Sequence, residues 1–206
     1  MIFKIFLFII LIPFAIYSQK AEVTNKTEFG FWMGASNPLP GSPTSKVLST
    51  SLGFGLYTRF PFPFNKLLTE IGGGYSNFLS KTDRGLQVMP IYVALDYKLP
   101  FELPVAIYLK GGGGGAYVIA RPNNSAKWDP AGFLGSEVSF TAGRKVRIGL
   151  RVDYYKIFET TGTHKPPIAQ YLFNSPTDDS RLYNPQYYQL HNADFFHFNL
   201  MVGFLF

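Results

Sequence analysis

The last segment of the chain constrains the fold most, because its apolar residues recur at every second position. Between residues 196 and 206, one parity carries only large apolar side chains. These are Phe196, Phe198, Leu200, Val202, Phe204 and Phe206. The other parity is mixed and includes His197, Asn199 and Gly203. A two-residue period of this kind predicts a β-strand with one apolar face and one mixed face.

The same alternation occurs in seven earlier segments, so the sequence predicts eight strands. Most of them are close to the ~9–11 residues that a tilted strand needs to cross a bilayer. The predicted strands are residues 27–36, 48–60, 67–78, 87–99, 105–120, 131–141, 146–157 and 195–206. In the second strand, we place Leu48 and Leu52 on the outward, apolar face. No sequence repeat and no second domain is evident in the rest of the chain.

The connections between the predicted strands alternate in length. Three are short and rich in turn-forming residues, namely 61–66, 100–104 and 142–145. The intervening ones are longer and more polar, namely 37–47, 79–86, 121–130 and 158–194. Short turns at one end and long loops at the other are typical of up-and-down barrels. The sequence therefore predicts an all-β fold, an eight-stranded antiparallel up-and-down transmembrane β-barrel.

The first eighteen residues have the features of a secretory signal peptide. Lys4 precedes an apolar run from Ile5 to Ile16, and Ser18 is a small residue at a suitable cleavage point. A membrane-anchoring helix is the alternative, but the run is shorter than the ~20 residues that such a helix needs. We therefore expect a signal peptide at 1–18 and a barrel domain at 19–206. The chain has no cysteine, and a closed barrel can be stable without disulfides because its backbone groups are paired.

The parity opposite the apolar one carries almost all the charges of the predicted strands. These are Glu28, Arg59, Glu70, Asp96, Lys98, Lys110, Glu137, Arg147, Arg151 and Asp153. A charge on the lipid face near mid-membrane costs ~2–4 kcal/mol, so we expect this set to face inward. Lys156 has outward parity and is the exception.

Two interpretations of this inward set are open. An eight-stranded barrel has an interior just wide enough for side chains to fill it. The favoured interpretation is therefore a salt-bridged core, with Glu137–Arg151 and Glu70–Lys98 as candidate pairs. The alternative is a lumen that conducts ions or protons.

Glycines and aromatic residues refine the prediction. Inward Gly112 and Gly114 are expected to leave room for a bulky neighbour such as Tyr92. Two girdles of aromatic residues are also expected, as in membrane barrels. The outer girdle is Tyr75, Tyr117 and Tyr154, and the inner girdle is Phe60, Tyr97, Phe140 and Phe206.

With these features the chain resembles the small eight-stranded bacterial outer-membrane barrels, the OmpA-like and OmpX-like superfamily. The resemblance rests on the signal peptide, the alternating segments, the glycine-rich strands and the terminal segment 202–206. It implies a location in the outer membrane of a Gram-negative bacterium, with long loops extracellular and both termini periplasmic. It also implies contact with outer-membrane lipid or lipopolysaccharide, and recognition of Phe206 by the barrel-assembly machinery.

Functions in this superfamily include adhesion, serum resistance, small-solute passage and lipid A modification, and the fold does not choose among them. The favoured role is structural or interactive, through surface loops that bind an extracellular protein or a small-molecule ligand. The candidate residues lie in the last long loop and are Tyr171, Phe173, Tyr183, Tyr187 and Tyr188. Exposed aromatic residues on a rigid scaffold suit recognition. A narrow, porin-like channel for small solutes or ions is the alternative.

Other functions are less well supported by the residues. A lipid A acyltransferase or deacylase needs a His close to a nucleophile and a carboxylate. The chain offers only His164, His191 and His197, and none stands in a specific pattern with a nucleophile. No two His have metal-ligand spacing and there is no thiol, so neither a metal nor a cofactor is expected. The net charge is +6, but nucleic acid is an unsuitable partner for an exported protein, and lipid phosphates suit the charge better.

Overall fold

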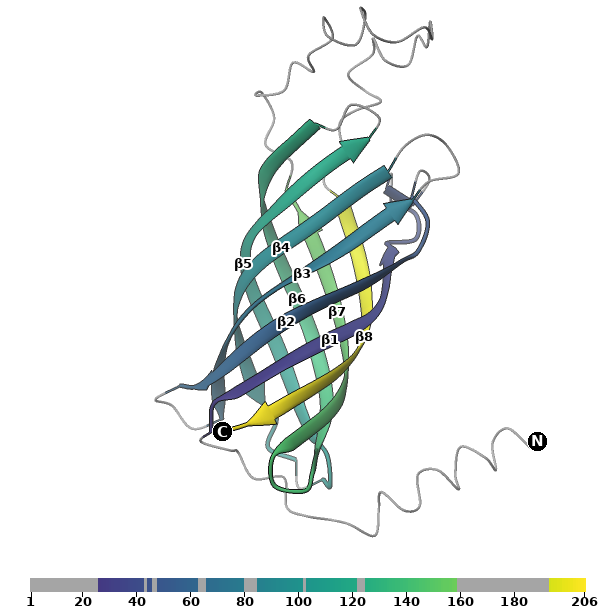
Figure 1. Cartoon of the computed structure of the whole chain (residues 1–206). Helices are drawn as coiled ribbons and strands as arrows, with labels where there is room; N and C mark the ends of the chain where they lie inside the picture. Colours follow the sequence, from purple (N-terminus) through teal and green to yellow (C-terminus); the bar gives the residue numbers. More distant parts are fainter. Residues whose placement is uncertain are drawn as a thin grey trace, which may run out of the picture.

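The sheet closes on itself because its first and last strands pair along their whole length. In the computed structural model, β1 forms antiparallel pairs with both β2 and β8. Each strand neighbours the next along the chain, giving a closed barrel of eight strands, as Figure 1 shows. The strands are β1 Glu28–Pro38, β2 Ser51–Pro61, β3 Leu67–Leu79, β4 Gly85–Lys98, β5 Ala106–Arg121, β6 Ser125–Ala142, β7 Val146–Ile157 and β8 Ala193–Leu205. The predicted fold class is confirmed.

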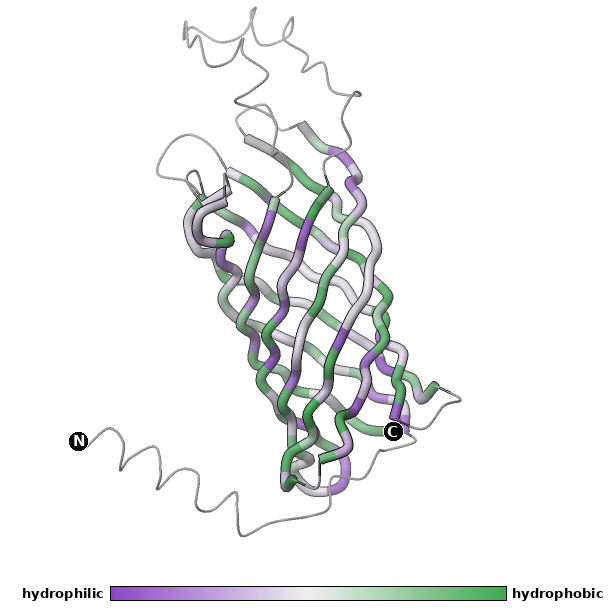
Figure 2. The backbone as a smooth tube through the Cα atoms, turned by 180° about the vertical axis from the view of Figure 1, so that it is seen from behind, coloured by the Kyte–Doolittle hydropathy of each residue, from purple (hydrophilic) through white to green (hydrophobic). Residues whose placement is uncertain are grey.

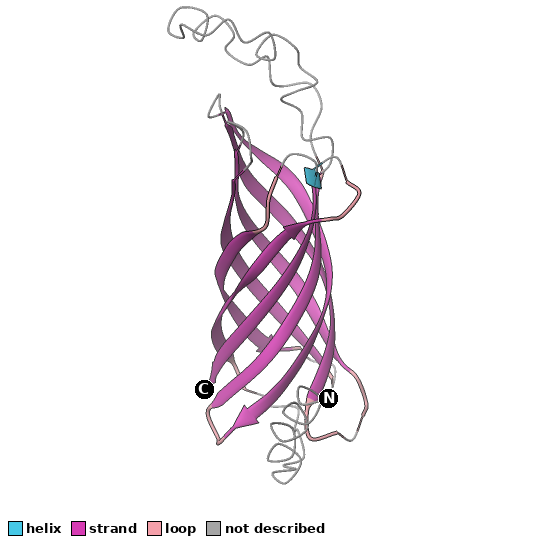
Figure 3. Ribbon diagram, turned by 90° about the vertical axis from the view of Figure 1, so that its right-hand side faces the viewer, coloured by secondary structure: helices cyan, strands magenta, loops and turns pink. Residues whose placement is uncertain are grey.

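The structure describes most of the predicted barrel domain, in eight ranges. They are residues 26–42, 44–45, 48–62, 66–79, 85–101, 103–121, 125–158 and 193–206. The predicted signal peptide lies outside these ranges and stays a prediction. Within them, one short helical turn at Thr44 and Ser45 is visible at the rim in Figure 3. No helix among the described residues has the length and apolar character needed to cross a membrane.

The strand bounds differ from the prediction mainly in β6. This strand begins at Ser125 rather than residue 131, so most of the predicted loop 121–130 is extended chain paired with β5. The polar residues Lys127 and Asp129 suggested a loop, but they lie on the inward parity, where their side chains pair at 3.5 Å. Trp128 between them faces outward and is 57% exposed. Because the inward residues of this segment are polar, the sequence pattern did not indicate a strand there.

Leu48 is a second correction. We expected it on the outward face of the second strand, but β2 begins three residues later, at Ser51. Leu48 is instead buried and belongs to an interior cluster that contains Phe78 and Phe195. The backbone N–H of Ser49 donates to the carbonyl of Leu79 at 2.9 Å, which directs this segment over the rim of the barrel.

The two faces of the wall differ as the alternation predicts. On β7, Leu150 is 64% exposed, whereas its neighbour Arg151 is only 2% exposed. Figure 2 shows the same alternation of hydrophobic and hydrophilic residues along the other strands. The outward residues that are large and exposed are almost all apolar. An apolar outer surface of this kind is favourable in contact with the hydrocarbon of a membrane and unfavourable in contact with water.

An ionic layer and three apolar clusters fill the barrel, and one of these clusters is Trp32, Tyr57 and Met201. The ionic layer described below lies in the middle. On the side of the short turns it is followed by a small cluster of Leu68, Ala106 and Tyr108. Toward the long connections lies a larger apolar cluster that includes Phe78, Tyr92, Phe133, Tyr155 and Phe195. The rings of Phe78 and Phe195 stack with centroids 4.5 Å apart.

The space for Tyr92 comes from a different glycine than expected. A Cβ on Gly72 of β3 would lie 2.5 Å from the Tyr92 hydroxyl, so Gly72 is required beneath this ring. A Cβ on Gly112 or Gly114 would instead strike the backbone of β4, at Val93 and Ile91 respectively. These two glycines therefore allow close approach of the β4 and β5 backbones rather than room for a side chain.

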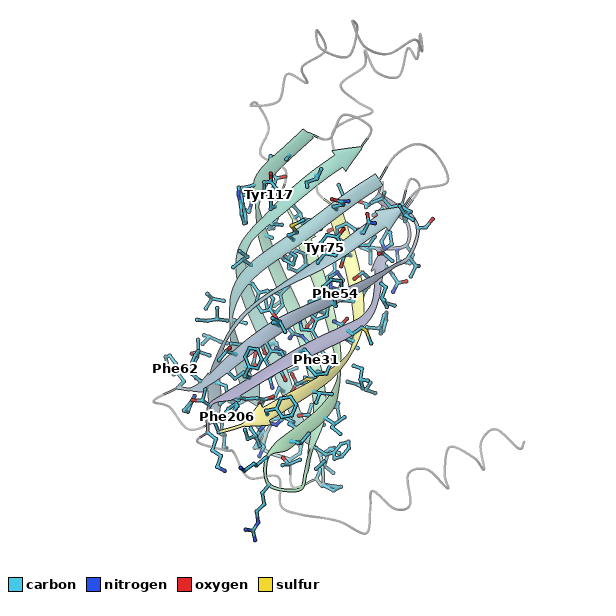
Figure 4. All side chains as sticks on the ribbon, viewed as in Figure 1. Phe31, Phe54, Phe62, Tyr75, Tyr117 and Phe206 are labelled. Atoms are coloured by element: carbon cyan, nitrogen blue, oxygen red, sulfur yellow. The ribbon has the colours of Figure 1, made fainter. Side chains whose placement is uncertain are left out.

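Aromatic residues gather toward both ends of the apolar wall. In Figure 4, Tyr75 and Tyr117 lie toward the long connections, and Phe62 and Phe206 lie toward the short turns. Tyr117 packs against Trp128 with ring centroids 5.3 Å apart, and Tyr75 packs against Phe54 at 5.6 Å. Aromatic rings at these two levels match the interfacial girdles of membrane barrels.

A charge placed on the middle of the wall should destabilise the folded barrel. For Leu150→Arg we expect a loss of about 2–4 kcal/mol in the free energy of unfolding, because the guanidinium would face hydrocarbon. Leu79→Arg is the matched control: its side chain is equally exposed, but it ends β3 at the rim, where we expect a loss of about 0–1 kcal/mol. Urea-titrated unfolding in lipid vesicles measures both, and equal losses would contradict a membrane-facing wall.

Candidate functional site

The ten charged residues predicted to face inward lie in one layer of the interior, apart from one at its edge. Nine of them are at most 5% exposed. These are Glu28, Arg59, Glu70, Asp96, Lys110, Glu137, Arg147, Arg151 and Asp153. Lys98 is the tenth and is only half-buried, because it is the last residue of β4. The nine buried residues are called the ionic layer below.

Strand register brings part of the ionic layer together. Glu28 of β1 is opposite Arg59 of β2, which is in turn opposite Glu70 of β3. Asp96 of β4 is opposite Lys110 of β5 in the same way. Inward residues directly across from each other are close, so acids and bases are neighbours across β1–β2, β2–β3 and β4–β5.

Two ion pairs cross the full width of the barrel. Arg59 of β2 donates from both terminal nitrogens to the Glu137 carboxylate of β6, and its Nη1–Oε1 distance is 3.0 Å. Arg151 of β7 donates from Nη1 to Oε1 of Glu70 on β3 at 2.8 Å. In each case the partners are four strands apart in a ring of eight, which is the largest separation the barrel allows. These two pairs therefore occupy the middle of the lumen.

Other contacts complete the ionic layer. Lys110 Nζ lies 2.5 Å from Oε2 of Glu70, and it lies 3.5 Å from both Asp96 and Glu137. Arg59 Nε lies 2.8 Å from both Glu70 and Asp96. Every one of these side chains is almost inaccessible to water. Since a buried charge is tolerated only when it is paired, the residues of the layer depend on one another.

The periphery of the layer is also paired. Arg147 Nη1 donates to Glu28 Oε2 at 2.7 Å. Arg151 Nε donates to Asp153 Oδ2 at 2.6 Å on the same strand.

Both specific pairs expected from the sequence are wrong. Glu137 and Arg151 are opposite each other in the β6–β7 register, but Glu137 bonds to Arg59 and Arg151 bonds to Glu70 and Asp153. Glu70 is opposite Ala94, four residues from Lys98, and its cationic partners are Arg59, Lys110 and Arg151. Long side chains reach across the lumen, so the neighbour in register is not always the partner.

Three tyrosines of the neighbouring apolar clusters contact the ionic layer and were not predicted as part of the site. Tyr57 donates its hydroxyl to Glu28 at 2.7 Å, and Tyr92 donates to Glu70 at 3.0 Å. The Arg59 guanidinium lies 4.9 Å from the ring centroid of Tyr57 and 5.7 Å from that of Tyr108. The inward parity of these residues was available as a signal, since an inward Tyr needs a partner for its hydroxyl.

His197 is buried beside this layer, opposite Asp153 in the β7–β8 register. Its ring lies among those of Trp32, Tyr155 and Phe195, with centroids 5.9–6.4 Å away. It faces the interior of the barrel. His164 and His191 lie outside the described residues. Within the described ranges, no group of three or more metal-ligating side chains could hold a metal ion.

The five aromatic residues proposed for surface binding belong to the last long connection. Tyr171, Phe173, Tyr183, Tyr187 and Tyr188 all lie outside the described residues. The ends of β7 and β8, from which this connection leaves, are nevertheless well fixed. Ile157 is opposite Ala193 in the register, and the N–H of Phe158 donates to the carbonyl of Pro130 at 2.8 Å.

Comparison with known proteins agrees with this architecture. No protein-family model matches the sequence, and no curated protein matches it. Neisserial surface protein A has a solved structure with a TM-score of 0.60 at 11% identity, and the match covers 89% of this chain and 98% of that chain. A major outer membrane protein from Thermus thermophilus gives a TM-score of 0.56 at 11% identity, covering 87% of this chain and 99% of that chain. At such identity the likeness shows the fold alone, that of a small outer-membrane β-barrel.

Removal of the central cation should weaken the barrel strongly. For Arg59→Met we expect a loss of about 3–5 kcal/mol in the free energy of unfolding, because Glu137 and its neighbours stay buried without this partner. Adding Glu137→Gln to Arg59→Met should cost less than the sum of the two single losses, since the residues are in contact.

Unfolding in detergent or lipid measures these losses, with Lys156→Gln as the control. Lys156 pairs with Asp194 at 3.6 Å on the outer wall with a partly exposed side chain, so we expect a change of only about 0–1 kcal/mol. A similarly small effect of Arg59→Met would contradict a cooperative ionic layer.

Proposed function

We propose that the protein is an outer-membrane barrel that serves as an anchor and presents its long connections to an extracellular protein or small-molecule ligand. The observation that carries this proposal is the pair of ion pairs across the lumen, Arg59–Glu137 and Glu70–Arg151. A lumen occupied by paired charges favours a rigid scaffold over a conduit. The ligand would then be bound by the connections between the strands, because binding residues are often carried by loops on a rigid scaffold.

The orientation in the membrane is part of the proposal. We infer that the long connections are extracellular and that the short turns and both termini are periplasmic, since this is the usual arrangement of such barrels. Phe206 is 76% exposed at the short-turn end, which supports its recognition by the barrel-assembly machinery.

The composition of the last connection supports recognition. A connection of this length, residues 158–194, is uncommon unless it is functional or disordered. It carries several aromatic residues, among them Tyr171 and Tyr187, and aromatic side chains are enriched at protein interfaces.

A narrow channel is the second candidate, supported by the ionic lining of the interior. Charged residues on facing strands can bind and pass ions if their pairs exchange partners. Lys110 contacts three acids within 3.5 Å, so alternative partners exist within reach. The dense pairing nevertheless favours the anchor.

Deletion of residues 165–188 should abolish ligand binding and leave the barrel folded. The ends of β7 and β8 are held by the β7–β8 register rather than by the deleted segment. Folding is checked by heat-dependent gel mobility, and binding by adhesion of bacteria that express each form to host cells or matrix proteins. A matched control replaces the same segment with a Gly/Ser linker of equal length. Undiminished adhesion by both variants would contradict the proposal.

Planar-bilayer recordings separate the anchor from the channel. For the refolded wild-type protein we expect no steady single-channel steps, because the crossing ion pairs fill the lumen. Steps that appear in the wild type and change with Lys110→Gln or Glu137→Gln would establish the channel instead.

A further inference from the structure

The apolar outward parity of the wall continues past the ends of the strands into two of the short turns. Phe62 follows the outward Phe60 of β2 by two residues, and Phe101 keeps the parity of the outward Tyr97 of β4. Leu103 precedes β5 and has the outward parity of that strand. Phe62, Phe101 and Leu103 are 37%, 57% and 44% exposed, respectively, and Figure 4 shows Phe62 at this end of the barrel.

The turn between β6 and β7 has a different character. Its outward parity is carried by Arg144, which is exposed together with Gly143 and Lys145. A charged side chain is unfavourable against hydrocarbon, so this turn is suited to water or to the level of the headgroups. Two of the short turns are therefore apolar on their outward parity, and the third is cationic.

The backbone of the two apolar turns is also unusual, because it is rich in proline. The prolines at or in these turns are Pro61, Pro63, Pro100 and Pro104. Proline has no backbone N–H, and an unpaired N–H is costly in hydrocarbon. The N–H of Phe62 donates to the carbonyl of Leu67 at 3.1 Å, and that of Leu99 donates to the carbonyl of Ile107 at 2.9 Å. These turns are therefore suited to lipid in their backbone as well as in their side chains.

The two apolar turns meet at one part of the rim. The backbone N–H of Lys98, the last residue of β4, donates to the carbonyl of Lys66 in the β2–β3 turn at 2.9 Å. Each turn carries one charged residue, Lys66 and Glu102, and Glu102 lies outside the described residues. The long stem of an exposed lysine can carry its charge from an apolar surface to the headgroups, so Lys66 is compatible with a lipid environment.

We propose that the β2–β3 and β4–β5 turns are immersed in the lipid leaflet that they face, whereas the β6–β7 turn lies in water. Phe62, Phe101 and Leu103 contact phospholipid at the boundary between headgroups and acyl chains. The partner is the lipid surface because these residues continue the apolar wall and its aromatic girdle without a change of parity. The barrel is then held more deeply in the leaflet on one side of its rim. This inference rests on the proposed membrane location, but not on a loop ligand or on the state of the lumen.

Single-cysteine spin labels test this proposal, because the chain has no cysteine of its own. The labelled variants are Phe62→Cys and Phe101→Cys, with Arg144→Cys as the matched control in a short turn and Leu150→Cys as the reference on the wall. In phosphatidylcholine vesicles, the labels at residues 62, 101 and 150 should be reached more readily by oxygen than by a water-soluble nickel complex. The label at residue 144 should show the opposite order.

Heat-dependent gel mobility reports whether each labelled variant is folded, and Leu103→Cys, with the same expected result, replaces either turn variant that is not. All of these side chains are exposed, so a label does not have to displace a packed neighbour. Nickel accessibility at residues 62 and 101 as high as that at residue 144 would overturn the proposal, and a protein partner for the turns would then be favoured. The membrane location would survive that result if the label at residue 150 still reports lipid. A label at residue 150 that is open to nickel would overturn the location and this inference together.

Discussion

Closure of the sheet by the β1–β8 pairing is the constraint on which the other features depend. The register runs from Glu28 opposite Leu205 to Pro38 opposite Phe195. In a hydrocarbon environment, unpaired backbone groups cost several kcal/mol each, so a strand edge cannot be left open. Closure also creates an enclosed interior, and it is the narrow width of an eight-stranded ring that forces inward side chains into contact.

That enclosure accounts for the chemistry of the ionic layer. Charges such as Arg59 and Glu70 cannot face lipid, and in the interior they have little access to water, so they must satisfy one another. Tyrosines complete this arrangement by donating hydroxyl groups to carboxylates and by offering ring faces to guanidinium groups. The result is a barrel whose centre is polar but solid, and this supports a role in which the wall and the connections, rather than the lumen, meet other molecules.

The sequence predicted the fold well because parity is a local property. The alternation around Leu150 and Arg151 assigns each side chain to a face without knowledge of its neighbours. The pairing within the interior was not predictable in the same way, since Glu137 finds its partner on β2 rather than on the adjacent β7. Lys127 and Asp129 were assigned to a loop for a related reason, because their polarity suits a loop. The burial of Asp129 and its contact with Lys127 show that they belong inside the barrel.

The crossing ion pairs also have a consequence for the order of assembly. Arg59 and Glu137 are separated by 78 residues, and Glu70 and Arg151 by 81. Because each pair joins strands on opposite sides of the ring, neither can form while the sheet is still an open, flattened intermediate. An intermediate of that kind could form only the local pairs, such as Arg59 with Glu28 and Glu70 on the adjacent strands and Arg151 with Asp153 on the same strand. The crossing contacts therefore form only once the ring has closed, and this makes them a marker of a completed barrel.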